Sequence, residues 1–170
     1  MDAKNNLQEF IISRVFDAPR DLVWKAFTEP QRMKQWWGPK GVTIVKSEMD
    51  LRPGGSYHYA MRTPDGSMMW GKMAYREITP PSRIVFVNSF SDEAGGVTRH
   101  PMAPTWPLQM LSTFLFEDVG GKTKFTVIWT PLNASEEERA TFAAGHASMQ
   151  QGWTGTLDKL GPYLAEARTA

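Results

Sequence analysis

The segment from about residue 133 to residue 160 is the only one in the chain long enough for an extended helix, and it follows a run of strand-like segments. Ser135 and Glu138 fit a capping box, in which each side chain bonds the backbone N–H of the other residue. Large side chains then recur at three- and four-residue steps along one face: Phe142, His146, Met149, Trp153, Leu157 and Leu160. This pattern predicts one long amphipathic helix near the end of the chain.

Three glycines interrupt the predicted helix, at Gly145, Gly152 and Gly155. Each interior glycine costs a helix about 1 kcal/mol relative to alanine. We therefore expect them to relieve steric pressure against a close neighbour, which is either a curved sheet or a cavity between sheet and helix. The step Gly161-Pro162 should kink or stop the helix, because proline lacks an N–H and clashes with the preceding turn.

The rest of the chain is dominated by strand patterns with polar and apolar residues in alternation. A first strand and two short helices are expected before residue 39, and six further strands follow, at 42–50, 56–62, 68–78, 83–90, 108–117 and 122–130. A bent antiparallel sheet around the terminal helix would bury the apolar faces of both. The sequence therefore predicts a single α+β domain over residues 1–170, with residues 1–7 flexible.

Composition narrows the function classes. The net charge of +1, without a cluster of basic residues, argues against a nucleic-acid partner. The absence of cysteine excludes disulfides, thiolate catalysis and cysteine-based metal sites. Neither an apolar signal region nor an 18-residue apolar run is present, so we expect a cytoplasmic protein without membrane insertion. Seven tryptophans and ten methionines suit an irregular apolar cavity, or simply a core of large side chains.

Four sequence motifs in order resemble a known family. They are RVFDAPRDLVWKAFTEPQRMKQWWGP (14–39), MDLRPGGSYHYAMRTPDG (49–66), YREITPPSRIVF (75–86) and SMQQGWTGTLDKL (148–160). The chain is similar to the domain named after the activator of the heat-shock chaperone ATPase, within the START/polyketide-cyclase/birch-allergen (SRPBCC) superfamily. The resemblance implies a helix-grip fold, in which a curved seven-stranded antiparallel sheet grips a long C-terminal helix, with two short helices after the first strand and a cavity in between. Superfamily members include lipid carriers, cyclases, hormone receptors and chaperone activators, so the fold alone does not give the function.

Inward-facing positions of the strands and the final helix are predicted to line that cavity: Tyr57, Tyr59, Met61, Phe86, Asn88, Phe90, Met110, Ser112, Phe114, Trp129, Met149 and Trp153. Most are apolar, and a few polar groups among them are typical of a small-molecule site. The alternative is that these side chains fill the space completely. Trp36 and Trp37 are assigned to packing rather than to ligand contact.

The segment 91–107 contains two glycines and three prolines, and we expect it to be irregular. His100, Met102 and Trp106 within it favour a lid over the cavity mouth. The alternative is a loop pinned at the edge of the domain.

No catalytic motif is recognisable. The three histidines have no metal-ligand spacing, and no nucleophile elbow, phosphate loop or dinucleotide fingerprint is present, so no catalytic residue, metal or cofactor is predicted. His58 is expected on the solvent face. His100 and His146 are candidates for a general base, but a polar anchor or an ordinary surface histidine is favoured for each. Arg14 is the best candidate for a buried charge, although we favour a salt bridge at the strand end.

Three functions compete. The first is binding of a hydrophobic or aromatic small molecule in the cavity, without defined catalysis. The second is a cyclase- or hydrolase-type enzyme on a polyketide-like or aromatic substrate, which needs a titratable group with a shifted pKa in the cavity. The third is a module that activates a chaperone ATPase. It is the least favoured, because the outer face of the sheet alternates toward polar residues.

Overall fold

A computed structural model describes residues 9–169 of the chain, without the side chain of Thr169. Its strands are β1 (Phe10–Phe16), β2 (Thr43–Met49), β3 (Ser56–Arg62), β4 (Met68–Thr79), β5 (Arg83–Ser91), β6 (Val97–Thr98), β7 (Met110–Val119) and β8 (Lys122–Pro131). Its helices are α2 (Arg20–Thr28), α3 (Pro30–Met33), α4 (Glu136–Ala144) and α5 (His146–Thr169). The flexibility expected for residues 1–7 lies outside the described residues.

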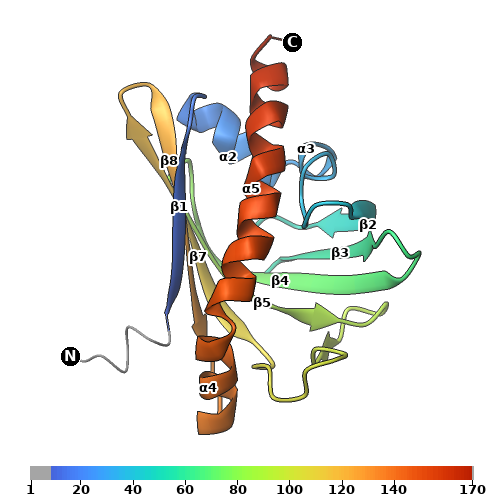
Figure 1. Cartoon of the computed structure of the whole chain (residues 1–170). Helices are drawn as coiled ribbons and strands as arrows, with labels where there is room; N and C mark the ends of the chain where they lie inside the picture. The colour runs from blue at the N-terminus through green and yellow to red at the C-terminus, as the bar shows by residue number, and fades with distance from the viewer. Residues whose placement is uncertain (1–8, 170) are drawn as a thin grey trace, which may run out of the picture.

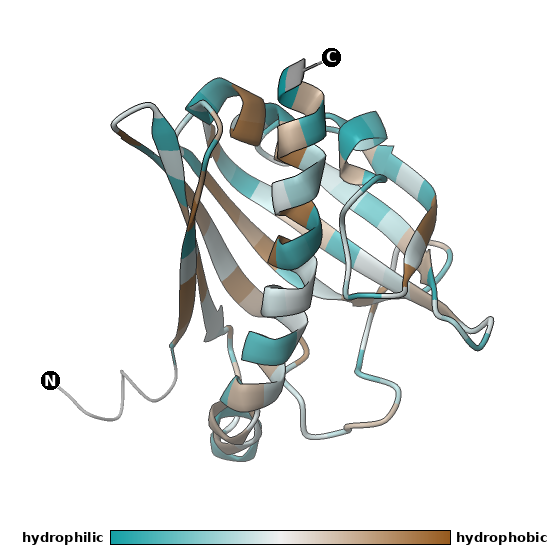
Figure 2. Cartoon of the chain, turned by 45° about the horizontal axis from the view of Figure 1, so that its top comes forward, coloured by the Kyte–Doolittle hydropathy of each residue, from teal (hydrophilic) through white to brown (hydrophobic). Residues whose placement is uncertain are grey.

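The strands form one antiparallel sheet in the order β1-β8-β7-β5-β4-β3-β2. The short β6 pairs with the end of β5 and adds an eighth strand to the expected seven. Figure 1 shows α5 lying across the curved sheet, with α2 and α3 beside its C-terminal half and α4 at its other end. Hydropathy alternates along the strands, which places one apolar face toward α5 (Figure 2). The helix-grip fold is confirmed.

Aromatic side chains fill the part of the interior next to α2, β7 and β8. Phe125 stacks on Phe27 at a centroid distance of 4.5 Å and also contacts Phe114 and Phe116 at 5.2 and 5.3 Å. Trp36 is 1% exposed, and its indole N–H donates to the carbonyl of Ala26, so its assignment to packing is confirmed. Burial of this many rings supplies the main apolar stabilisation of the domain.

The predicted single terminal helix is wrong in one respect, because the structure divides it at Gly145. The capping box is present at the start of α4: Ser135 Oγ accepts from the Glu138 N–H, and Glu138 Oε1 accepts from the Ser135 N–H. Gly145 then ends α4, and a Cβ at that position would lie 3.0 Å from the ring of Trp106. The break therefore lets the loop before β7 pack closely against the helices.

Of the kink or stop predicted at Gly161-Pro162, the stop is wrong, because α5 continues through Pro162 to Thr169. Proline removes one hydrogen bond from the helix, but tertiary contacts on both sides of it hold the last turns in place. Leu160 and Leu164 are buried, and Arg168 donates to the carbonyl of Asp17 at 2.7 Å. Tertiary packing outweighs the local preference of the sequence here.

Candidate functional site

A cavity of about 660 Å³ lies between α5 and the half of the sheet formed by β3, β4 and β5, and we call it the α5 pocket. Its remaining boundary comes from Trp37–Pro39, from α4 and from the loop before β7. The pocket is partly open to solvent, and its lining includes the exposed residues Ala144 and Ser148. The size of the α5 side chains that face these strands determines how much of the space between them is filled.

Small residues occupy the flank of α5 that faces the pocket. Gly145, directly before α5, and Ser148, Gly152 and Thr156 within it follow one another at three- and four-residue steps, and all four line the cavity. The flank that faces the other half of the molecule instead carries the buried side chains Trp153, Leu157, Leu160 and Leu164 at the same spacing. The small residues leave space beside the helix, and Met149 and Trp153 of α5 also line the pocket at the edge of this flank.

Aromatic rings form the end of the pocket next to Trp37. Trp37 lies edge-on to Tyr59 at 6.3 Å and to Trp153 at 5.5 Å. The ring of Tyr59 passes directly over Gly71, where a Cβ would lie 2.5 Å from the tyrosine hydroxyl. Gly71 is therefore required for the position of Tyr59. Burial raises the pKa of Tyr59, so its hydroxyl stays protonated at neutral pH.

Segment 91–107 contributes His100, Ala103, Trp106 and Pro107 to the pocket lining and is held against α4. Arg99 forms an ion pair with Glu138 at 2.7 Å, and Thr141 Oγ1 donates to Thr105 Oγ1 at 2.9 Å. The ring of Trp106 lies 5.6 Å from that of Phe142. The segment is less irregular than expected, because β5 extends to Ser91 and β6 pairs with it.

His100 belongs to the same segment and lines the pocket. Its ring lies edge-on to Phe90 at 4.8 Å, and its Nδ1 accepts the N–H of Met102 at 3.0 Å. Burial lowers the pKa of His100, which makes the neutral ring the main form at pH 7. With Nδ1 accepting, the neutral ring carries its proton on Nε2.

The pocket otherwise contains few polar groups. Ser112 is fully buried, and its hydroxyl donates to Oδ1 of Asn88, which fixes the Asn88 amide at the pocket wall. Among the described residues that line the pocket, none is Asp, Glu, Lys or Arg. Nor do the described residues contain a group of three or more metal-ligating side chains. The described lining of the pocket is therefore largely apolar.

Most of the predicted cavity residues lie at the pocket: Tyr59, Met61, Phe86, Asn88, Phe90, Met110, Trp129, Met149 and Trp153. Tyr57, Ser112 and Phe114 do not line it and correct the prediction. They are buried by their neighbours, with Tyr57 stacked under Tyr59 and Phe114 inside the aromatic core. A strand pattern shows that a side chain points inward. It does not show whether another side chain covers that side chain or a cavity lies beside it.

Among the predicted lid residues, His100 and Trp106 line the pocket and Met102 does not. Met102 is 88% exposed, because the turn that directs its N–H toward His100 directs its side chain into solvent.

Sequence reasoning missed several lining residues, among them Trp37, Met69, Gly71 and Met73. Met69 and Met73 pair across β3 and β4 with Met61 and Tyr57, so the alternation of β4 carried a signal for both. The sequence assigns Trp37 to packing alone. In the structure its ring packs against Tyr59 and Trp153, and it also lines the pocket.

The remaining histidines lie away from the pocket lining. His58 stacks on Trp70 at 5.0 Å and is only partly exposed, because its Nε2 lies 3.0 Å from the carbonyl oxygen of Asp92. The ring of His146 lies between Phe10 and Phe142, and its buried Nε2 has no hydrogen-bond partner within residues 9–169. The three histidines therefore do not form one catalytic group.

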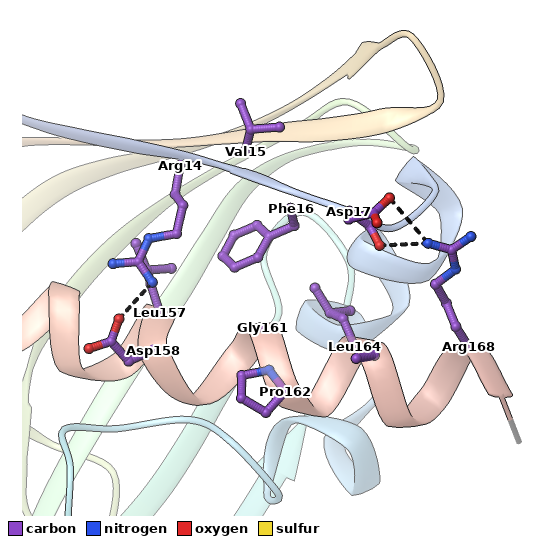
Figure 3. A pocket seen from close by; sticks show the side chains of 11 residues that line it. Arg14, Val15, Phe16, Asp17, Leu157, Asp158, Gly161, Pro162, Leu164 and Arg168 are labelled. Carbon is purple, nitrogen blue, oxygen red and sulfur yellow. Dashed lines mark hydrogen bonds and ion pairs between the residues drawn. The ribbon is translucent and has the colours of Figure 1, made fainter.

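A second concavity, of about 730 Å³, lies between β1 and the C-terminal half of α5. Figure 3 shows two ion pairs across it, Arg14 with Asp158 at 2.9 Å and Arg168 with Asp17 at 3.3 Å. The expected salt bridge of Arg14 is thus confirmed. Each charged side chain that lines this groove has its partner within the chain, so we do not assign the functional site to it.

Comparisons with solved structures return proteins with the same arrangement. A protein from Nitrosomonas europaea is 23% identical, with full coverage of both chains and a TM-score of 0.76. A protein from Arthrobacter aurescens is 26% identical over 97% of this chain and 90% of the other, also with a TM-score of 0.76. An AHSA1 protein from Silicibacter pomeroyi is 19% identical over 94% of this chain and 99% of the other, with a TM-score of 0.69.

A search of curated proteins found no match. Within the described part of the chain, no helix combines the length and the apolar character needed to cross a membrane. A family model described as Activator of Hsp90 ATPase homolog 1-like protein matches residues 17–165. The match covers most of the chain and agrees with the helix-grip fold and with the order of the sequence motifs. The protein belongs to this family, within the SRPBCC superfamily.

Proposed function

We propose that the protein binds an uncharged apolar or aromatic small molecule in the α5 pocket. The observation that carries this proposal is a cavity of about 660 Å³ whose described lining is mostly apolar and aromatic, with a few polar side chains and no Asp, Glu, Lys or Arg. Cavities of this size and character are typical of small-molecule sites. A charged ligand would lose its hydration there without gaining a partner of opposite charge.

An enzymatic role has less support. His100 and Tyr59 are the titratable side chains among the described lining residues, and no carboxylate lies with them. The tyrosine is held in its neutral form by burial, and the histidine has no acidic group to orient it. A chaperone partner is suggested by the family's name alone. The cytoplasmic location expected from the sequence stays a prediction.

A matched pair of dyes tests the proposal. N-phenylnaphthylamine is uncharged, and anilinonaphthalene sulfonate has the same ring system with an added negative charge. We expect saturable binding of the uncharged dye, with one dye per chain by native mass spectrometry, and weaker binding of the sulfonate. If neither dye binds, or if the sulfonate binds more tightly, the proposal is wrong.

Two variants locate the bound dye. Asn88→Asp adds a negative charge to the pocket wall at nearly constant shape, and we expect it to weaken binding of the uncharged dye. Arg14→Ala removes an ion pair in the groove between β1 and α5 and should leave the dye affinity unchanged. The opposite result would place the dye in the groove.

A further inference from the structure

Gly152 has no structural requirement for glycine. It lies inside α5, and it is absent from the residues with positive φ. A Cβ built at this position meets no atom within 4 Å. Because glycine is one of the least favourable residues in a helix interior, the folded structure alone would prefer almost any other residue here.

Three other glycines, in the pocket lining or in α5, each have a neighbouring atom close to the position that a Cβ would take. At Gly71 a Cβ would overlap Tyr59, at 2.5 Å. At Gly145 it would crowd Trp106, at 3.0 Å. At Gly155, three residues further along α5, it would lie in ordinary contact with the backbone nitrogen of Lys40, at 3.6 Å. Gly152 is the one of these four beside which no atom lies.

Gly152 lines the α5 pocket, and it also borders an open surface concavity that it shares with Gly155 and Lys40. Gly152 is in the middle of the pocket flank, with Ser148 one turn before it and Thr156 one turn after it, and all three line the cavity. The hydroxyl of Thr156 donates to the carbonyl of Gly152 at 3.0 Å, so this carbonyl is already paired. The helix therefore presents a flat and nearly apolar surface to the cavity at this turn.

We infer that Gly152 is a specificity-determining residue, which sets the width of the α5 pocket so that a bulky, uncharged ring system can lie flat against the backbone of α5. This inference rests on the proposed function and adds where the ligand lies and how large it is. A side chain at position 152 would occupy the space that the ring needs. The folded domain would tolerate the substitution, because no atom of the protein stands in its way.

The test is a graded series, Gly152→Ala, Gly152→Val and Gly152→Leu, titrated with N-phenylnaphthylamine and with naphthalene as a smaller uncharged competitor. We expect the Kd of the larger dye to rise with side-chain size and to increase about tenfold or more for leucine, which is the effect of losing one well-packed contact surface. Naphthalene should be affected least. Circular dichroism and thermal unfolding identify the variants that are folded.

Gly155→Ala is the matched control, because it changes the same residue type in the same helix outside the described pocket lining. Both Gly→Ala variants should raise the Tm, by about 2–4 °C for a chain of this size, and only Gly152→Ala should weaken the larger dye. An unchanged Kd across the folded position-152 variants would overturn the inference while wild-type binding still supports the proposed function. Failure of the wild-type protein to bind either compound would instead overturn the proposed function.

Discussion

The two flanks of α5 show opposite solutions to the same packing problem. Toward β1, β7 and β8, the helix presents Trp153, Leu157 and Leu160, which are buried against aromatic rings. Toward β3, β4 and β5, it presents Ser148, Gly152 and Thr156, and a cavity remains. The half with β1, β7 and β8 is closely packed against α5 and contributes most to stability. The half with β3, β4 and β5 is packed less closely against α5, and the pocket lies there. Substitutions of the same kind should therefore have different effects in the two halves.

The largest difference is expected between two phenylalanines. Phe125 is fully buried and contacts several rings, so Phe125→Ala should cost about 3–5 kcal/mol of unfolding free energy. Phe90 lines the pocket and is only partly buried, so Phe90→Ala should cost about 1 kcal/mol. Urea unfolding followed by tryptophan fluorescence measures both. Equal costs would show that the pocket half is as tightly packed as the core.

A smaller effect is expected at the entrance to α4. Ser135→Ala removes the hydroxyl that accepts the Glu138 N–H, and loss of such a cap costs about 1 kcal/mol. Because α4 and segment 91–107 are linked by Arg99 and Glu138, amide exchange should increase in both while the β7–β8 hairpin keeps its protection. Ser148→Ala, an exposed position on α5, is the control. A uniform loss of protection across the sheet would contradict an independent pocket half.

The smallest effect is a pH dependence of the pocket mouth. Burial lowers the pKa of His100 in the folded state, so the unfolded chain takes up a proton at higher pH than the native protein. The contribution of His100 to stability is therefore complete above its unfolded pKa, near 6.5, and is lost as the pH falls toward the lower folded value. We expect amide exchange of segment 91–107 to increase between pH 7.5 and pH 5.5. His100→Gln should reduce this change, and an equal change in both proteins would assign it to another group.

Several parts of the fold were predictable from local pattern. The alternation in β3 and β5 gave the inward direction of Tyr59, Phe86 and Asn88, and these residues do line the pocket. The spacing of Ser135 and Glu138 gave the start of α4. Such patterns succeed because the direction of a side chain follows from the geometry of its own helix or strand. They failed for Tyr57 and Phe114, which also point inward but are covered by other rings.

By itself, the sequence determined the order of the helices and strands, the buried face of each and the near absence of charge at the inward positions. The tertiary structure decided which inward positions became core and which became cavity. It also decided that the terminal helix breaks at Gly145 and continues through Pro162. Periodicity reports the direction in which a side chain points, whereas packing depends on the distance to the opposite wall, which is set by residues far apart in the chain. Gly145 and Gly152 illustrate both points. The sequence indicated a close neighbour or a cavity beside each glycine. In the structure Trp106 packs against Gly145, whereas the space beside Gly152 is open.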